Sequence, residues 1–84
     1  MTRDELRATL LRILGTVAPE ADLATLRTDR PLREQLDIDS FDLLTMMVRI
    51  REAVGVDVPD ADYARLRTID DAAAYLEARL AARA

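Results

Sequence analysis

The chain has 84 residues, half of them apolar and a third charged, with a formal net charge of −4 and no histidine, cysteine or lysine. A chain of this length supports one hydrophobic core, and its composition is that of a folded domain and not of a disordered segment. For chemistry it offers carboxylates, two tyrosines and a single serine, which disfavours a self-sufficient enzyme and a metal site with histidine or thiolate ligands.

Two global features limit the location and the partners. No apolar run approaches the roughly 18 residues of a membrane-spanning helix, and the N-terminal sequence lacks the order of a signal peptide. We therefore expect a cytoplasmic protein that does not associate with membranes. Residues 37–62 hold seven acidic residues against two arginines. This acidic centre disfavours nucleic acid and favours a basic protein surface as the partner.

The first predicted helix begins after Thr2, because Glu5 follows three residues later in the pattern of a capping box. Its apolar residues recur at helical spacing, and it should end between residues 15 and 18, before Pro19. A long connection follows over roughly residues 18–38. We expect a short helical turn after Pro31 and contacts with the core from Leu23, Leu26, Leu32 and Leu36.

The central helix should begin in the stretch DIDSFDLL, with Asp39 or Ser40 as its N-cap, and should run to Val54 with Gly55 as its C-cap. Its apolar residues form two stripes roughly 120° apart. The first stripe is expected in the core and contains Leu43, Met47, Ile50 and Val54. The second, Phe41, Leu44 and Val48, either widens the core or faces a partner, and the charged residues Arg49, Arg51 and Glu52 on the remaining surface favour a partner.

After this helix, a loop with a short helix around residues 60–66 leads to a last helix capped by Thr68. The buried stripe of the last helix is expected to contain Ile69, Ala73, Leu76 and Leu80. No strand pattern is present. The fold class is therefore all-α: a small bundle of three main helices plus one short helix, with a long loop between the first and second helices, in one domain over residues 1–84.

Spacing alone leaves the role of Ser40 open. A serine at a helix start is commonly an N-cap, which stabilises a helix by about 1 kcal/mol. The free N–H groups of a helix N-terminus also suit a phosphate on a seryl oxygen, and Asp39 could cap the helix or support a metal ion of a modifying enzyme. The nearby acids do not form a calcium loop, because Phe41 and Asp42 stand where a ligand and a glycine are needed. A DNA-binding helix-turn-helix is disfavoured by the lack of a basic recognition helix.

Three motifs together resemble those of the acyl carrier protein family: LDIDSFDLL, GVDVPD after the central helix, and LRTIDDAAAYL leading into the last helix. The resemblance covers nearly the whole chain. It implies that Ser40 holds 4′-phosphopantetheine, transferred from coenzyme A by a magnesium-dependent phosphopantetheinyl transferase, and that Asp39 supports this attachment. The thiol at the end of that arm would allow a chain without cysteine to hold acyl groups as thioesters.

The resemblance also implies a surface that faces partner enzymes. Its apolar contacts would be Phe41, Leu44 and Val48, and its acids would be Asp42, Glu52, Asp57, Asp60 and Asp62. Thr45 and Arg51 would belong to the same surface, at positions where fatty-acid members commonly have an acid, and Arg49 adds a further positive charge. This departure points to a dedicated carrier with its own ligase or biosynthetic cluster.

We therefore expect a monomeric, freestanding carrier that is not an enzyme, has no metal site, and delivers acyl groups in specialised biosynthesis or in fatty-acid or polyketide-like metabolism. Its partners would be the phosphopantetheinyl transferase, an acyl- or aminoacyl-loading ligase or transferase, and downstream biosynthetic enzymes. Two alternatives stay open. One is an aminoacyl carrier loaded by a ligase similar to aminoacyl-tRNA synthetases, and the other is an unmodified helical interaction domain in which Ser40 is only an N-cap.

Overall fold

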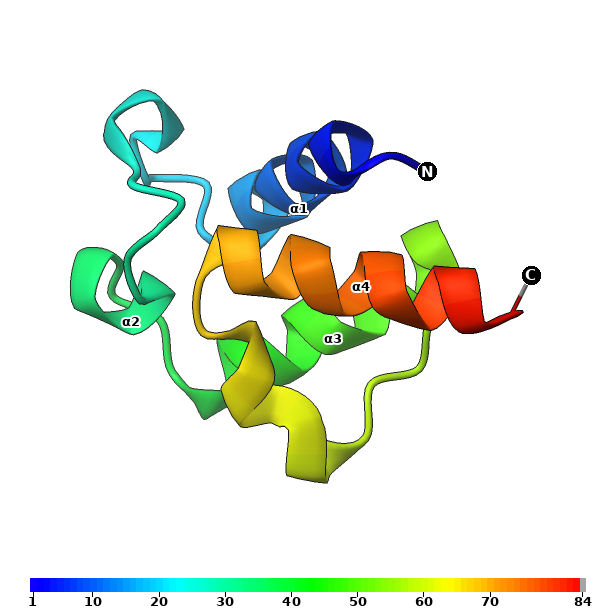
Figure 1. Ribbon diagram of the computed structural model, residues 1–84. Helices are drawn as coiled ribbons and strands as arrows, with labels where there is room; N and C mark the ends of the chain where they lie inside the picture. Colours follow the sequence, from blue (N-terminus) through cyan, green and yellow to red (C-terminus); the bar gives the residue numbers. More distant parts are fainter. Residues whose placement is uncertain (84) are drawn as a thin grey trace.

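The computed structural model describes residues 1–83, and every regular element in that range is a helix (Figure 1). Three helices of 15 residues dominate: α1 (Arg3–Val17), α3 (Ser40–Val54) and α4 (Ile69–Arg83). Shorter pieces are α2 (Leu32–Gln35) and two 3₁₀ helices, η1 (Leu23–Thr25) and η2 (Asp60–Leu66). The all-α prediction, with three main helices and a long first connection, is confirmed.

Local capping sets the ends of the main helices. At the start of α1, Thr2 Oγ1 accepts a hydrogen bond from the Glu5 N–H at 3.2 Å, and Glu5 Oε1 accepts one from the Thr2 N–H at 2.8 Å. Gly55 ends α3 in the left-handed region at φ 79°, which favours glycine. The Thr68 hydroxyl accepts from the Asp71 N–H at 2.9 Å and so caps α4.

The long connection between α1 and α3 is tied to the start of α4. The Leu32 N–H donates to the Arg67 carbonyl at 2.9 Å, and the Asp70 N–H donates to the Thr28 carbonyl at 3.0 Å. Leu32 is buried, and Leu23, Leu26 and Leu36 are half-buried against the core, as predicted. These contacts hold the segment that leads into α3, so the first residues of α3 have a fixed position.

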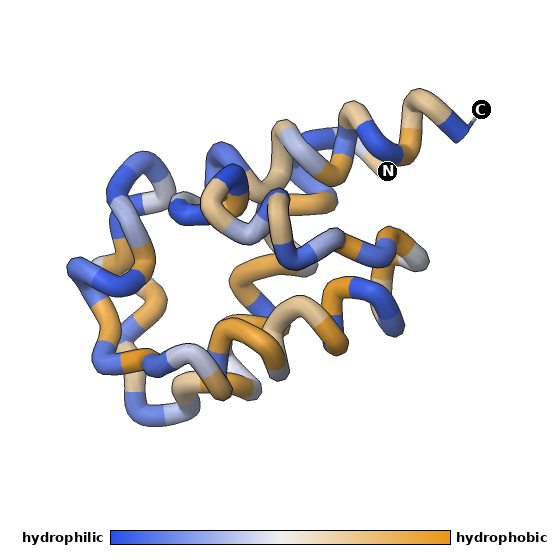
Figure 2. The backbone as a smooth tube through the Cα atoms, turned by 90° about the horizontal axis from the view of Figure 1, so that it is seen from below, coloured by the Kyte–Doolittle hydropathy of each residue, from blue (hydrophilic) through white to orange (hydrophobic). Residues whose placement is uncertain are grey.

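The core lies between α1, α3 and α4; in Figure 1, α4 lies in front of α3, and α1 lies above both. In Figure 2, apolar positions recur through much of α3. The side chains with no exposed surface come from all three helices: Leu6, Leu10, Leu14, Ile50, Ile69, Ala72, Ala73 and Leu76. Within residues 1–83, no helix has both the length and the apolar character needed to cross a bilayer.

The predicted stripes of α3 and α4 face the core, with Met47, Ile50, Ile69, Ala73 and Leu76 buried, but the buried sector of each helix extends further to one side than predicted. On α3, Leu43 and Val54 are only half-buried, whereas Met46 is almost fully buried. On α4, Leu80 is half-buried and Tyr75 is buried. The cause is packing between helices. Helix α1 packs against both α3 and α4, and on α3 this contact buries the side that contains Met46.

Candidate functional site

The N-terminus of α3 is closed by two aspartates. Asp39 Oδ1 accepts from the Asp42 N–H at 3.0 Å, and Asp42 Oδ2 accepts from the Asp39 N–H at 3.0 Å. These reciprocal bonds form a capping box with Asp39 as the N-cap. Ser40 is the first residue inside the helix, so the interpretation of Ser40 as the N-cap is wrong, and the alternative that Asp39 caps the helix is confirmed.

The hydroxyl of Ser40 therefore has no structural task. Ser40 is exposed, and among residues 1–83 its hydroxyl forms no hydrogen bond within the chain. The backbone N–H groups of Ser40 and Phe41 also have no partner in the described part of the chain. Two free N–H groups at the positive end of a helix dipole favour a negatively charged group on the neighbouring oxygen. The site thus fits a seryl phosphodiester.

The same site does not have the parts of a hydrolase. With no histidine in the chain, the nearest acid–base groups are carboxylates, and those of Asp39 and Asp42 are engaged in the capping box. Across residues 1–83, no three acidic residues gather in a way that could hold a metal ion. An exposed hydroxyl without a base suits a group that another enzyme modifies, because that enzyme can bring the base with it.

The second apolar stripe of α3 faces solvent. Phe41 is 80% exposed, Leu44 50% and Val48 51%, so the alternative in which this stripe widens the core is wrong. We call the surface formed by these three residues with Thr45, Arg51 and Glu52 the outer face. Thr45, Arg51 and Glu52 are exposed, and the Thr45 hydroxyl donates to the Phe41 carbonyl at 2.9 Å. An exposed apolar stripe along a helix is typical of a surface that binds a partner.

The predicted acids divide into two groups. Asp57 and Asp60 are exposed beside η2. Asp42 is half-buried in the capping box, and Asp62 accepts a hydrogen bond from the Tyr75 hydroxyl at 2.6 Å. Burial raises the pKa of Tyr75 above its ordinary value, so this hydroxyl stays protonated and can donate. Asp62 therefore ties η2 to α4, whereas Asp57 and Asp60 stay exposed, with Asp60 close to the Tyr63 hydroxyl.

Sequence patterns did not indicate a narrow apolar groove between α2, α3 and η2. It has a volume of about 140 Å³ and is lined mainly by apolar side chains: Leu32, Leu43, Met47, Tyr63 and Leu66. Its walls come from three segments that are separate in the sequence, so no local pattern could have revealed it. Leu43 lines this groove, which explains why it is only half-buried although it belongs to the predicted core stripe.

Comparisons with known proteins agree with the geometry. The sequence model of a family described as "phosphopantetheine attachment site" matches residues 4–76. The acyl carrier protein of Renibacterium salmoninarum is 33% identical over 78 residues, which cover 89% of this chain and 91% of that protein. The chain belongs to the acyl carrier protein family.

Other acyl carrier proteins show similar identity. That of an Arthrobacter species is 35% identical over 77 residues, covering 89% of this chain and 91% of its own length. The meromycolate extension acyl carrier protein of Mycolicibacterium smegmatis is 32% identical over 76 residues, covering 90% of this chain and 76% of its own. This acyl carrier protein is thus a non-catalytic carrier with a phosphopantetheine attachment site, whose partners include a phosphopantetheinyl transferase and acyl-handling enzymes.

Proposed function

We propose that Ser40 is the attachment residue for 4′-phosphopantetheine and that the chain delivers acyl groups held as thioesters on this arm. The observation that supports this proposal is the exposed hydroxyl of the only serine, one residue inside a helix that Asp39 already caps. The hydroxyls of Thr2, Thr16, Thr45 and Thr68, in contrast, form hydrogen bonds within the chain.

The chemistry requires little from the chain itself. The Ser40 oxygen forms a phosphodiester bond with the phosphopantetheine phosphate of coenzyme A, the pyrophosphate bond breaks, and the adenosine bisphosphate leaves. The serine proton passes to a base of the transferase, because the chain offers no free base at this position. Asp39 supports the transfer by fixing the first turn of α3 and by placing a negative charge beside the reacting oxygen. When bound, the arm supplies the thiol that the chain lacks.

The outer face of α3 is the surface that we expect acyl-handling enzymes to contact. It adjoins Ser40 and combines the exposed apolar stripe with Thr45, Arg51 and Glu52, and the exposed acids Asp57 and Asp60 lie at η2. Such a small surface suits brief, salt-sensitive complexes. We infer that residues 1–84 act as one monomeric carrier domain.

Acyl groups are the cargo that the observations favour. The related proteins named above are acyl carriers, and the apolar groove between α2, α3 and η2 offers a surface for part of an acyl chain. A dedicated biosynthetic pathway, suggested by the basic residues of the central helix, and an aminoacyl cargo remain predictions. Mass spectrometry of the loaded protein from its native host would identify the group.

The attachment is tested by intact mass. The protein is incubated with coenzyme A, magnesium and a phosphopantetheinyl transferase of broad specificity, and it should gain the mass of one phosphopantetheine. Trypsin then releases residues 34–49, because the chain has arginines at 33 and 49 and no lysine, and this peptide should contain the added group. Ser40→Ala should gain nothing. No mass gain in the native protein, or an unchanged gain in Ser40→Ala, would contradict the proposal.

A further inference from the structure

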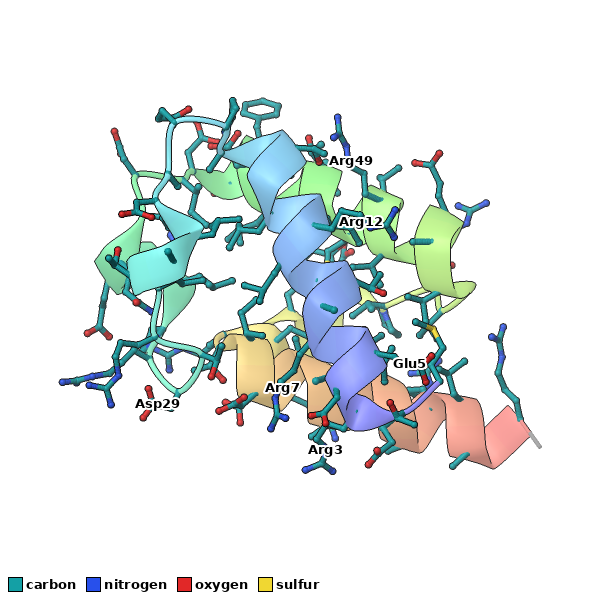
Figure 3. The ribbon with its side chains drawn as sticks, turned by 90° about the horizontal axis from the view of Figure 1, so that it is seen from above. Arg3, Glu5, Arg7, Arg12, Asp29 and Arg49 are labelled. Carbon is teal, nitrogen blue, oxygen red and sulfur yellow. The ribbon has the colours of Figure 1, made fainter. Side chains whose placement is uncertain are left out.

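An open hollow lies where α1 crosses α3, outside the site described above. It has a volume of about 490 Å³, and the residues that line it are Arg12, Ile13 and Thr16 of α1 with Arg49, Glu52 and Ala53 of α3. Figure 3 shows the side chains of Arg12 on α1 and Arg49 on α3 near the place where the two helices cross. Two guanidinium groups thus border one depression in a protein whose net charge is −4.

Neither arginine contributes an ion pair to the fold. Within residues 1–83, Arg12 and Arg49 have no carboxylate within 4.0 Å and form no side-chain hydrogen bond. Arg7 on the same helix differs, since it contacts Asp70 of α4 at 2.9 Å and Asp4 at 2.8 Å. Two like charges at one hollow repel each other weakly in solvent. Folding therefore gives no reason for the pair, and both groups are free to bind a carboxylate.

The hollow forms one flank of the outer face. A rotation of 100° per residue places Arg49 beside Val48, on the side of α3 that faces α1. Glu52 lines the hollow and also belongs to the outer face. The opposite side of α3, at Leu43 and Met47, borders the groove against η2, where Asp57 and Asp60 are exposed. The hollow on the α1 side thus carries two arginines against one acid, Glu52, whereas the η2 side carries charges of both signs, with Asp57, Asp60 and Glu34 against Arg33 and Arg67.

We propose that the enzyme that loads the acyl group binds the outer face with carboxylates at Arg12 and Arg49 and with basic side chains opposite Asp57 and Asp60. An apolar stripe alone permits several docking directions, whereas a pair of arginines on one flank favours those directions that place carboxylates of the partner there. Arginine is suited to this task, since its guanidinium binds a carboxylate with two parallel hydrogen bonds. The inference deepens the proposed function and rests on it, because the loading enzyme must reach the arm on Ser40.

The first test is a charge reversal on the arm-bearing protein. The probe is the enzyme of the native host that acylates this protein, purified by following thioester formation. Arg12→Glu combined with Arg49→Glu should lower kcat/KM of acylation about tenfold at low salt, with a smaller loss at high salt. The control, Arg27→Glu combined with Arg30→Glu, changes the net charge equally at two exposed arginines of the connection between α1 and α3, and it should acylate as the native protein does.

The second test uses the absence of lysine from the chain. Arg49→Lys and Arg12→Lys each introduce a single side-chain amine, and a carbodiimide joins such an amine directly to a carboxylate that it contacts. Peptide mapping of the complex should show the new lysine bound to an aspartate or glutamate of the loading enzyme. Arg30→Lys should give no such product. Coupling only within the chain, to Glu52, would overturn the proposal.

The outcomes separate this inference from the proposed function. If no phosphopantetheine is added to Ser40, the proposed function fails and the inference fails with it. If the arm is added but the double glutamate variant is acylated as fast as the native protein, or faster, only the inference fails. A neutral pair, Arg12→Gln with Arg49→Gln, should give an intermediate loss, and circular dichroism of each variant checks that the helices remain folded.

Discussion

The starts of α1 and α3 have the same local motif, but the threonine or serine hydroxyl has a different role in each. Both are capping boxes, but in α1 the cap is the hydroxyl of Thr2, which accepts the Glu5 N–H at 3.2 Å. In α3 the cap is the carboxylate of Asp39, which accepts the Asp42 N–H at 3.0 Å. The hydroxyl at the start of α1 is engaged in the helix cap, whereas the hydroxyl at the start of α3 lies one residue further along and is exposed.

The surroundings of the two helix starts differ in the same way. The first turns of α1 are fixed to α4 by two ion pairs, Arg3 with Glu77 at 2.8 Å and Arg7 with Asp70 at 2.9 Å. The first turn of α3 has no ion pair to another described element and exposes Phe41. This difference shows that the Ser40 hydroxyl can stay free for modification because the carboxylate of Asp39 caps the helix in its place.

The largest effect is expected from Ser40→Ala. This substitution should abolish the addition of phosphopantetheine, because no other hydroxyl occupies that position. It should change the free energy of unfolding by less than about 0.5 kcal/mol, since Asp39 still caps α3 and alanine is a good helix former. Intact mass and urea unfolding measure the two quantities. A loss of about 1 kcal/mol or more would mean that Ser40 has a structural role and that the two helix starts are alike.

Asp39→Asn should separate the role of Asp39 in capping α3 from its role in phosphopantetheine attachment. Asparagine caps helices about as well as aspartate, so the stability should be nearly unchanged. The negative charge beside Ser40 is lost, however, and the rate of phosphopantetheine addition should fall about tenfold, the size of effect seen when a group that supports a metal site is altered. The time course of the mass gain measures this rate. An unchanged rate would limit Asp39 to capping.

Thr2→Ala is the matched change at the other helix start. It removes the hydroxyl that caps α1 and should lower the free energy of unfolding by about 1 kcal/mol. Phosphopantetheine addition should proceed at the native rate, because the hydrogen bonds of Thr2 are with Glu5 of the same helix. The same mass and unfolding assays apply to this variant. A slower addition would show that the α1 cap also supports the position of Ser40.

The helix boundaries could be predicted from the sequence because each is set by neighbours in the chain. Thr2 with Glu5, Gly55, and Thr68 each specify a helix end through contacts within about four residues. The motif around Ser40 likewise led to the attachment residue that we propose. The identity of the cap was also readable: Asp39 has an acid three residues later, as a capping box needs, whereas Ser40 has Leu43 at that position.

The remaining features depend on contacts between distant segments. The hollow at Arg12 and Arg49 exists because α1 crosses α3, and the bond from Tyr75 to Asp62 exists because η2 packs on α4. The direction of the buried sector of α3, which favoured Met46 over Leu43, has the same origin. Helical periodicity gives the residues of a face but not the neighbour that covers it.

The smallest effect is expected from Glu5→Gln, which isolates the acidic member of the α1 box. In the folded protein the Thr2 N–H, followed by the Thr2 side chain, holds the pKa of Glu5 below its ordinary value. Ionised Glu5 therefore stabilises the fold above the pKa of the unfolded chain, and this contribution is lost as the pH falls through the folded pKa. Glutamine keeps an acceptor for the Thr2 N–H but does not titrate. The native protein should be slightly more stable than the variant at about pH 6, and the difference should vanish near pH 3 in urea unfolding. Parallel stability curves over this range would show that the charge of Glu5 contributes nothing to the stability of the α1 capping box.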